Sequence, residues 1–366
     1  MNSRTRVLIL SRRWPPFCGG AERQLELGAR HLASGLPLCV IAGHQGRTPP
    51  AAPPLVTIKE PALRGASTLV FIFVALARGL AFRPTVVLAN QLNETALLAR
   101  LISLLTGARL IIRLSAFGQV GNIAWARKRT LASLYLSTLK RAWRIVVSTE
   151  SFLGELREAG VADGATRIIP NMVEDPGQTG THPDPATLLW CGRMDDEKDP
   201  LLALDALASA SCPKNLRLRV CGTGALEERV RARVQELGLQ ERVILEGFMR
   251  DPLPLMRTSS ALLFTSLEDA MPNVILEAMA AGLPVIATRT DGSCRLVEDG
   301  VTGWLAPDRN PETLGRLVAR LAGDPELARK MGRQARDRVM ARHGVKTVLP
   351  LWQAVLSGDT TDTIRP

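Results

Sequence analysis

Short runs of consecutive apolar residues alternate with longer amphipathic segments along most of the chain. Runs that are apolar at successive positions are typical of strands buried on both faces of a sheet. Because a helical pattern follows each run, the order predicts parallel strands covered by helices. The predicted strands cover residues 7–10, 38–42, 86–89, 110–114, 145–148, 188–191, 216–221, 243–246, 261–265 and 284–287.

A break in this alternation separates the strands into two series. Residues 174–186 are rich in Pro, Gly and Thr and lack apolar periodicity, as expected of a linker. A chain of 366 residues is long enough for two domains with separate cores. We therefore predict an α/β protein with two doubly wound Rossmann-like domains, residues 1–173 and 187–342, facing each other across a cleft. A C-terminal helix and tail, 343–366, is expected to pack back on the first domain.

Residues 66–82 form a strongly apolar stretch for which two interpretations remain open. The stretch is short for a transmembrane span, contains Arg78 and ends at Arg83-Pro84. A core helix between two strands is the favoured interpretation, and a helix lying in the plane of a membrane is the other. The apolar run near the N-terminus is too short for the core of a signal peptide.

Charge is distributed unevenly between the two series. The chain has 46 Lys and Arg against 35 Asp and Glu, and residues 1–180 hold 22 of the basic but 10 of the acidic residues. A basic first half suggests an anionic partner, such as a membrane surface, a phosphorylated substrate or nucleic acid. Nucleic acid is disfavoured because the sequence contains no helix-turn-helix, zinc-finger or RNP-type motif.

The six cysteines are scattered, without a CxxC pair or a Cys/His cluster. This pattern argues against a zinc site or a disulfide framework and makes a reducing cytoplasm the simplest setting. We therefore expect neither a metal nor a cofactor.

Basic residues concentrate in segment 125–144, which is helical in pattern and contains no acidic residue. Three aromatic residues are interleaved among the cations. Such a helix favours attachment to an anionic membrane face, and a solvated helix closing the first domain is the alternative. The candidate residues for the membrane or acceptor side are Arg127, Lys128, Arg129, Lys140 and Arg141.

Two candidate cations follow the first strand of the second domain. Arg193 and Lys198 lie on the loop after Gly192, and Asp199-Pro200 is typical of an N-cap followed by the first helical residue. Two cations beyond the end of a parallel strand suit a diphosphate, and a solvated surface pair is the alternative.

Another strand-loop-helix unit, residues 261–281, carries two carboxylates. Asp269 lies on the predicted loop and Glu277 in the helix that starts near Pro272. Carboxylates there can accept hydrogen bonds from sugar hydroxyls, while the helix N-terminus faces a phosphate. An ordinary helix-surface residue is the alternative for Glu277. In the first domain, Gly19-Gly20 precedes a helix and either approaches an anion or forms a tight turn.

Together these motifs resemble the GT-B retaining glycosyltransferases of family four, the glycosyl transferases group 1. The resemblance rests on Gly19-Gly20, on GRMDDEKD at 192–199, on the spacing from Asp269 to Glu277, and on EDGVTGWLAP at 298–307. It implies metal-independent, retaining transfer of a hexosyl unit from a UDP- or GDP-type sugar to a glycan or lipid-linked acceptor. The implied pathway is bacterial surface polysaccharide, lipopolysaccharide or glycolipid synthesis.

The resemblance also assigns roles to residues. Arg193 and Lys198 would hold the donor diphosphate, Glu277 the ribose, and Asp269 the hydroxyls of the transferred sugar. The implied donor-binding residues are Gly19, Gly20, Gly192, Met271, Pro272, Asn273 and Val274. The enzyme would be cytoplasmic and peripheral on the inner face of the membrane, with its basic domain facing the acceptor.

Four positions depart from the family pattern. Asp269 stands where Glu is usual, Arg295 replaces a carboxylate, and Asn90 and Ser115 stand where histidines are common. These departures keep a second hypothesis open, in which the protein is a catalytically degenerate sugar-nucleotide-binding subunit of a glycan-assembly complex.

Overall fold

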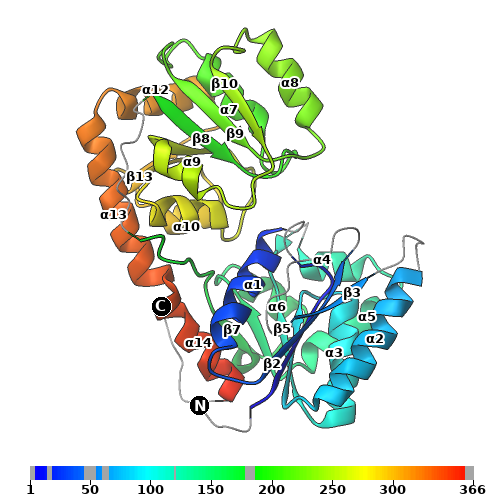
Figure 1. The fold of residues 1–366 in the computed structure, drawn as a ribbon. Helices are drawn as coiled ribbons and strands as arrows, with labels where there is room; N and C mark the ends of the chain where they lie inside the picture. The colour runs from blue at the N-terminus through cyan, green and yellow to red at the C-terminus, as the bar shows by residue number, and fades with distance from the viewer. Residues whose placement is uncertain are drawn as a thin grey trace. The chain divides into compact units, whose positions relative to one another are not determined.

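The computed structural model describes residues 5–14, 19–44, 55–59, 66–118, 121–177 and 186–358. Two compact units make up the chain, residues 1–172 with 348–366, and residues 173–347 (Figure 1). Each unit is built around a parallel sheet, so the predicted α/β class with two doubly wound domains is confirmed. Residues 178–185 of the predicted linker and 359–366 of the predicted tail lie outside the described part of the chain.

The first unit contains a seven-stranded sheet in the order β3-β2-β1-β4-β5-β6-β7, with every pairing parallel. All residues of β1 and β4 are buried, because helices cover both faces of the sheet. The strands are β1 (Val7–Ser11), β2 (Leu38–His44), β3 (Leu55–Lys59), β4 (Val86–Asn90), β5 (Arg109–Arg113), β6 (Arg144–Val147) and β7 (Thr166–Ile168).

Helices α2, α3 and α5 form one layer on this sheet, and α1 lies with α14 on the other side (Figure 1). Helix α3 has clear end signals, because Asn93 caps its N-terminus and Gly107 ends it in the left-handed conformation. The helices are α1 (Gly20–Leu32), α2 (Ala66–Phe82), α3 (Glu94–Thr106), α4 (Asn122–Arg127), α5 (Ala132–Lys140), α6 (Phe152–Glu158) and α14 (Val345–Ser357).

The second unit contains a six-stranded parallel sheet in the order β10-β9-β8-β11-β12-β13. Its strands are β8 (Thr187–Cys191), β9 (Arg217–Cys221), β10 (Val243–Gly247), β11 (Ala261–Phe264), β12 (Val285–Thr288) and β13 (Gly303–Ala306). Its helices are α7 (Pro200–Ala208), α8 (Glu227–Glu236), α9 (Leu253–Thr258), α10 (Asn273–Ala280), α11 (Asp291–Leu296), α12 (Pro311–Ala322) and α13 (Pro325–His343).

The prediction of one helix over residues 125–144 is wrong. Helix α4 ends at Arg127, α5 begins at Ala132, and Arg144 is already the first residue of β6. The turn lets Trp125 and Tyr135 pack edge to face with their ring centroids 5.5 Å apart. In a continuous helix these residues would lie about 15 Å apart along the axis, so their packing favours two helices.

Three short strands, β3, β7 and β13, were not predicted from the sequence pattern. β3 and β7 are the edge strands of the first sheet, and β13 is an edge strand of the second. An edge strand is only partly covered, so it lacks the long apolar run that marks a central strand. The four residues of β13 are all buried, but the strand is short and begins with Gly303, so its apolar run has only three residues.

Helix α2 occupies the apolar stretch that left two interpretations open. Phe71 and Ala75 are fully buried, so one side of α2 belongs to the core. The other side leaves Phe73 exposed. Within the described residues, no helix combines the length and apolarity needed to cross a bilayer.

Candidate functional site

The sheet of the second unit reverses its strand order between β8 and β11. The chain leaves β8 towards β9 on one side, and it leaves β11 towards β12 on the other. Ligands of open parallel sheets bind beyond the carboxyl ends of the strands at such a switch point. Lys198 lies on the loop after β8 and Asp269 on the loop after β11, so the switch point carries two predicted site residues.

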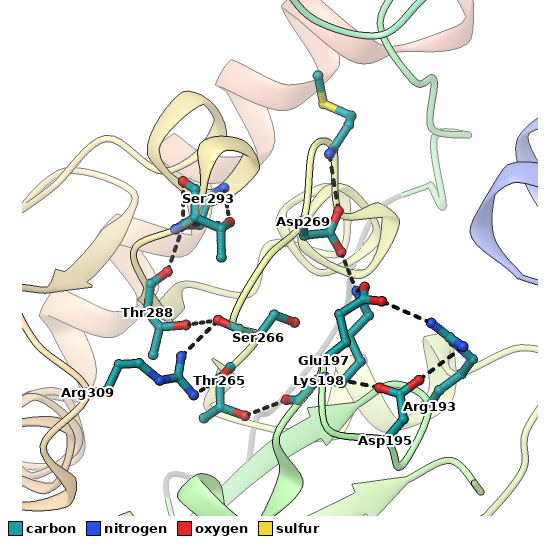
Figure 2. A network of polar contacts seen from close by, with 12 residues as sticks. Arg193, Asp195, Glu197, Lys198, Thr265, Ser266, Asp269, Thr288, Ser293 and Arg309 are labelled. Carbon is teal, nitrogen blue, oxygen red and sulfur yellow. Dashed lines mark hydrogen bonds and ion pairs between the residues drawn. The ribbon is translucent and has the colours of Figure 1, made fainter. Parts of the chain in front are cut away.

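Lys198 and Asp269 join these two loops by an ion pair (Figure 2). Lys198 Nζ lies 2.8 Å from Asp269 Oδ2 and 2.6 Å from Glu197 Oε1, and the side chains of Lys198 and Asp269 are 17% and 19% exposed. The other carboxylate oxygen of Asp269 accepts a hydrogen bond from the backbone N–H of Met271 at 3.1 Å. Both oxygens of Asp269 therefore have partners within the protein.

The environment of Lys198 keeps its side chain charged. Burial disfavours the ammonium form, but the carboxylates of Asp269 and Glu197 outweigh burial and raise the pKa of Lys198. Lys198 is therefore a fixed cation at neutral pH, poised between two carboxylates at the switch point.

Arg193 lies on the same loop but at its surface. Its side chain is 62% exposed and pairs with Asp195 at 3.0 Å and Glu197 at 3.5 Å. Exposed ion pairs contribute little to stability, so the guanidinium can turn towards an anionic ligand at small cost. Asp195 also accepts a hydrogen bond from the backbone N–H of Lys198 at 3.0 Å, which shapes the loop between the two cations.

Gly192 begins this loop and packs closely against Gly222, at the end of β9. The backbone N–H of Gly192 donates to the carbonyl of Cys221 at 3.0 Å. Gly222 has φ +145°, and a Cβ there would lie 1.8 Å from the carbonyl oxygen of Gly192. Gly222 was missed in the sequence, although a Gly-Thr-Gly run directly after a predicted strand is a usable signal.

Arg309 and Thr265 bind the two loops together and were also missed. The guanidinium of Arg309 pairs with Asp199 at 2.5 Å. It also donates to the carbonyls of Thr265 and Ser266, each at 2.9 Å (Figure 2). The Thr265 hydroxyl lies 2.7 Å from the carbonyl oxygen of Asp199. Nothing in the local sequence around Arg309 marks this role, because its partners are more than 40 residues away.

Helix α10 carries the remaining predicted residues of this unit. Met271 and Pro272 are buried just before the helix, and Asn273 and Val274 begin it. Glu277 lies in the second turn and is half-buried. The predicted N-cap Asp199 and first helical residue Pro200 of α7 are also found, so the sequence signals located both helix starts.

Arg295 lies at the next helix, α11, and pairs with Asp291 one turn earlier at 3.2 Å. Asn90 and Ser115 are the two first-unit residues that stand where the family commonly has histidine. Asn90 ends β4, and its side-chain amide donates a hydrogen bond to the Ser11 hydroxyl at 3.3 Å. The backbone N–H of Ser115 donates to the side chain of Asn122 at 2.9 Å.

Gly19 and Gly20 belong to the first unit, where they begin α1. Gly19 has an ordinary φ of −82°, and the atom nearest to a Cβ built there is a carboxylate oxygen of Glu22. Glu22 is buried and accepts a hydrogen bond from Gln91 at 3.3 Å. A buried carboxylate at this helix N-terminus weakens its attraction for phosphate, and the role of Gly19 and Gly20 stays a prediction.

Arg127, Lys128, Arg129, Lys140 and Arg141 are all exposed, on and around α4 and α5. Two of the three interleaved aromatics already have cationic partners, since Arg129 stacks on Trp125 and Arg109 on Trp143. The third, Tyr135, is buried. The basic residues are therefore exposed to an external partner, although Arg129 also contacts Trp125, whereas these aromatic rings are engaged within the protein.

In the described part of the chain, no group of three or more His, Cys, Asp or Glu side chains is placed to hold a metal ion. The cysteines Cys39, Cys191, Cys212, Cys221 and Cys294 are free thiols.

Two family models match adjacent parts of the chain. Residues 172–338 match the model described as glycosyl transferases group 1, and residues 18–172 match the glycosyl transferase 4-like domain. The boundary between the two matches coincides with the boundary between the two compact units.

Curated relatives resemble parts of the chain. An exopolysaccharide phosphotransferase of Streptomyces coelicolor is 29% identical over 58% of this chain and 23% of its own length. The N-acetylgalactosamine-N,N'-diacetylbacillosaminyl-diphospho-undecaprenol 4-alpha-N-acetylgalactosaminyltransferase of Campylobacter jejuni is 28% identical over 43% of each chain. The chain spans less than two thirds of the length of these relatives.

The structure of HepE from Anabaena, in complex with UDP and glucose, matches over 97% of this chain and 100% of its own. The TM-score is 0.79 at 20% sequence identity, which is a likeness of fold. The prediction of a GT-B fold is confirmed.

Proposed function

We propose that this chain is a retaining glycosyltransferase. Its residues 172–338 belong to the glycosyl transferases group 1, and its residues 18–172 belong to the glycosyl transferase 4-like domains. It moves a hexosyl unit from a nucleoside-diphosphate sugar of UDP or GDP type to a glycan or lipid-linked acceptor. The observation that carries this proposal is the partly buried cation Lys198, held at the switch point beside Asp269 and close to the start of α10.

The chemistry of the leaving group explains why such a site needs cations. Breaking the bond between the sugar and the diphosphate leaves negative charge on the phosphate oxygens. Lys198, Arg193 and the N-terminus of α10 stabilise that charge, and preorganised charges of this kind are among the strongest contributions to catalysis. The same groups serve in place of a metal ion, so the proposed transfer is metal-independent.

The proposed retaining course needs no separate general base. Attack takes place on the face that the diphosphate leaves, and a phosphate oxygen accepts the proton of the acceptor hydroxyl. Glu277 binds the ribose and Asp269 the hydroxyls of the transferred sugar. Because both oxygens of Asp269 have protein partners, the sugar shares this carboxylate with Lys198 and the Met271 N–H.

Two observations support a lipid-linked acceptor in surface polysaccharide, lipopolysaccharide or glycolipid synthesis. The name of the Campylobacter relative includes an undecaprenol diphosphate. The first unit, on the proposed acceptor side, carries the exposed cations Arg127, Lys128, Arg129, Lys140 and Arg141. We therefore place the reaction at the cytoplasmic face of the membrane, with the protein bound peripherally.

The experiment measures donor binding first and turnover second. Thermal shifts with UDP-, GDP-, ADP- and dTDP-sugars identify the donor, and nucleoside diphosphate release is then followed with and without lipid-linked acceptor extracts. We expect a stabilising donor and acceptor-dependent release in the wild type, and Lys198→Met should abolish both. Donor binding that persists unchanged in Lys198→Met contradicts the proposed site. Binding without release beside a demonstrated acceptor would favour the degenerate sugar-nucleotide-binding subunit.

A further inference from the structure

The helical layer α2–α3–α5 of the first unit leaves an unusual number of apolar side chains at its surface. Of the twelve exposed large hydrophobic residues in the described chain, eight lie on these three helices and a ninth, Leu131, lies directly before α5. We call these nine residues the apolar face: Leu69, Val70, Phe73, Val74, Leu101, Leu104, Leu105, Leu131 and Leu134. Monomeric soluble proteins rarely leave such clusters uncovered, so the layer has a partner.

The spacing on α2 shows that its exposed residues form a stripe. Leu69, Phe73 and Ala77 follow one another at helical intervals and are exposed, whereas Phe71 and Ala75 on the opposite side are fully buried. Burial in the core accounts for one side of α2 and leaves the other side unexplained. Phe73, which is 70% exposed, is the largest side chain of this stripe.

Helix α3 adds a second stripe beside the first. Leu101, Leu104 and Leu105 are exposed, and Leu104 is 72% exposed. Figure 1 shows α2 and α3 side by side, and the two helices are in contact. Because α2, α3 and α5 each connect two parallel strands, their C-terminal ends lie at the same edge of the sheet.

Cations are frequent in the segment that carries this apolar face, and acidic residues are almost absent from it. Residues 66–144 contain eleven Lys and Arg and a single carboxylate, Glu94. Glu94 is already paired with Arg12 at 3.0 Å. The exposed cations of the segment are Arg78, Arg83, Arg127, Lys128, Arg129, Lys140 and Arg141.

We propose that the apolar face docks on an anionic lipid bilayer, with Phe73 and Leu104 entering the interfacial region and the exposed cations of the same segment contacting lipid phosphates. Apolar insertion and electrostatic attraction together give stable peripheral binding where either alone is marginal. The inference deepens the proposed function, and rests on it for its role, because it names the surface that presents a lipid-linked acceptor.

The charge of the face favours a bilayer over a second copy of the chain. In a symmetric dimer the same patch faces itself, so cations would meet cations with few carboxylates between them. An anionic bilayer complements the whole face at once, both its apolar stripes and its cations.

The test compares vesicle binding of the full chain and two matched double variants by sedimentation. Vesicles contain equal parts of phosphatidylcholine and phosphatidylglycerol, or phosphatidylcholine alone. Phe73→Ser with Leu104→Ser removes two exposed apolar side chains from the face. Ile244→Ser with Phe248→Ser removes two exposed apolar side chains from the second unit and is the control.

We expect the wild type and the control to sediment with anionic vesicles, and the Phe73/Leu104 variant to bind about tenfold or more weakly. Changing the five cations Arg127, Lys128, Arg129, Lys140 and Arg141 to Gln should abolish the preference for anionic lipid. Raised salt should weaken vesicle binding by the wild type only in part, whereas the Phe73/Leu104 variant should lose its remaining binding.

Three outcomes would overturn the proposal. These are a wild type that does not bind anionic vesicles, a Phe73/Leu104 variant that binds like the control, and a dimer that this variant converts to a monomer in light scattering. The outcome is separable from that of the proposed function, because nucleoside diphosphate release with a water-soluble acceptor analogue should be unchanged in the Phe73/Leu104 variant.

Discussion

Replacing Lys198 by Met tests the central ion pair, because the change removes the charge but keeps most of the side-chain volume. Met leaves the partly buried Asp269 with one backbone hydrogen bond and without its cation. Both partners of the pair are less than one fifth exposed, so solvent screens the lost interaction only partly. We therefore expect a loss of about 1–3 kcal/mol in the free energy of unfolding.

Urea denaturation measures this loss, and an exposed ion pair on α13 provides the control. Arg329 pairs with Glu326 at 2.6 Å, but these side chains are 50% and 78% exposed. Arg329→Met removes a pair of similar geometry, and we expect little change because water screens it. The reasoning is refuted if Lys198→Met lowers the unfolding free energy no more than Arg329→Met does.

The pH dependence of the same variant gives an independent readout. Although burial disfavours the charged form, Asp269 and Glu197 raise the pKa of Lys198 above its unfolded value. The pair therefore contributes its full stability below the ordinary lysine pKa, about 10.4, and this contribution is lost as the pH rises through the raised pKa. The difference in stability between wild type and Lys198→Met should be constant near neutral pH and shrink at strongly alkaline pH.

Three further predictions concern residues that the structure singles out. Arg113→Met should lower the unfolding free energy by about 3 kcal/mol in urea denaturation. The guanidinium of Arg113 is buried, which lowers its pKa to about 10, and it donates hydrogen bonds to Ala21, Asn90 and Asn171. A loss as small as that of a surface variant contradicts this prediction. Gly222→Ala should weaken donor binding in thermal-shift titrations by displacing Gly192, whereas Gly238→Ala, with positive φ but open space around it, should not. Arg309→Met should weaken donor binding although it removes no donor-binding residue, and unchanged affinity would show that the loops hold their positions without it.

Buried strands were the most predictable part of the fold, because both of their faces are covered and successive residues must be apolar. β1, β4, β8 and β11 were found within one residue of their ends. Edge strands such as β3 were missed, since one side of an edge strand has no neighbouring strand and the apolar pattern is weaker.

The candidate site was predictable where a local motif implies a local role. The loop after β8 and the start of α7 follow sequence signals, namely glycine after a strand and an N-cap followed by proline. The pairing of Lys198 with Asp269 could not be predicted, because the strand order of the sheet brings together two residues that are 71 positions apart in the sequence. The division of segment 125–144 was hidden for a similar reason, since the packing of Trp125 on Tyr135 is a tertiary contact.

These long-range contacts couple the two loops that carry the candidate site. The guanidinium of Arg309 pairs with Asp199 and also donates to the carbonyls of Thr265 and Ser266. It therefore connects the loop after β8 to the loop after β11. Lys198 and Asp269 lie on these two loops and pair with each other. A donor whose phosphate contacts Lys198 therefore brings its sugar towards Asp269, which shares its carboxylate between Lys198 and a sugar hydroxyl. Donor phosphate and donor sugar are thus expected to be recognised together, and a double-mutant cycle on Lys198 and Asp269 should give strongly non-additive losses in donor affinity.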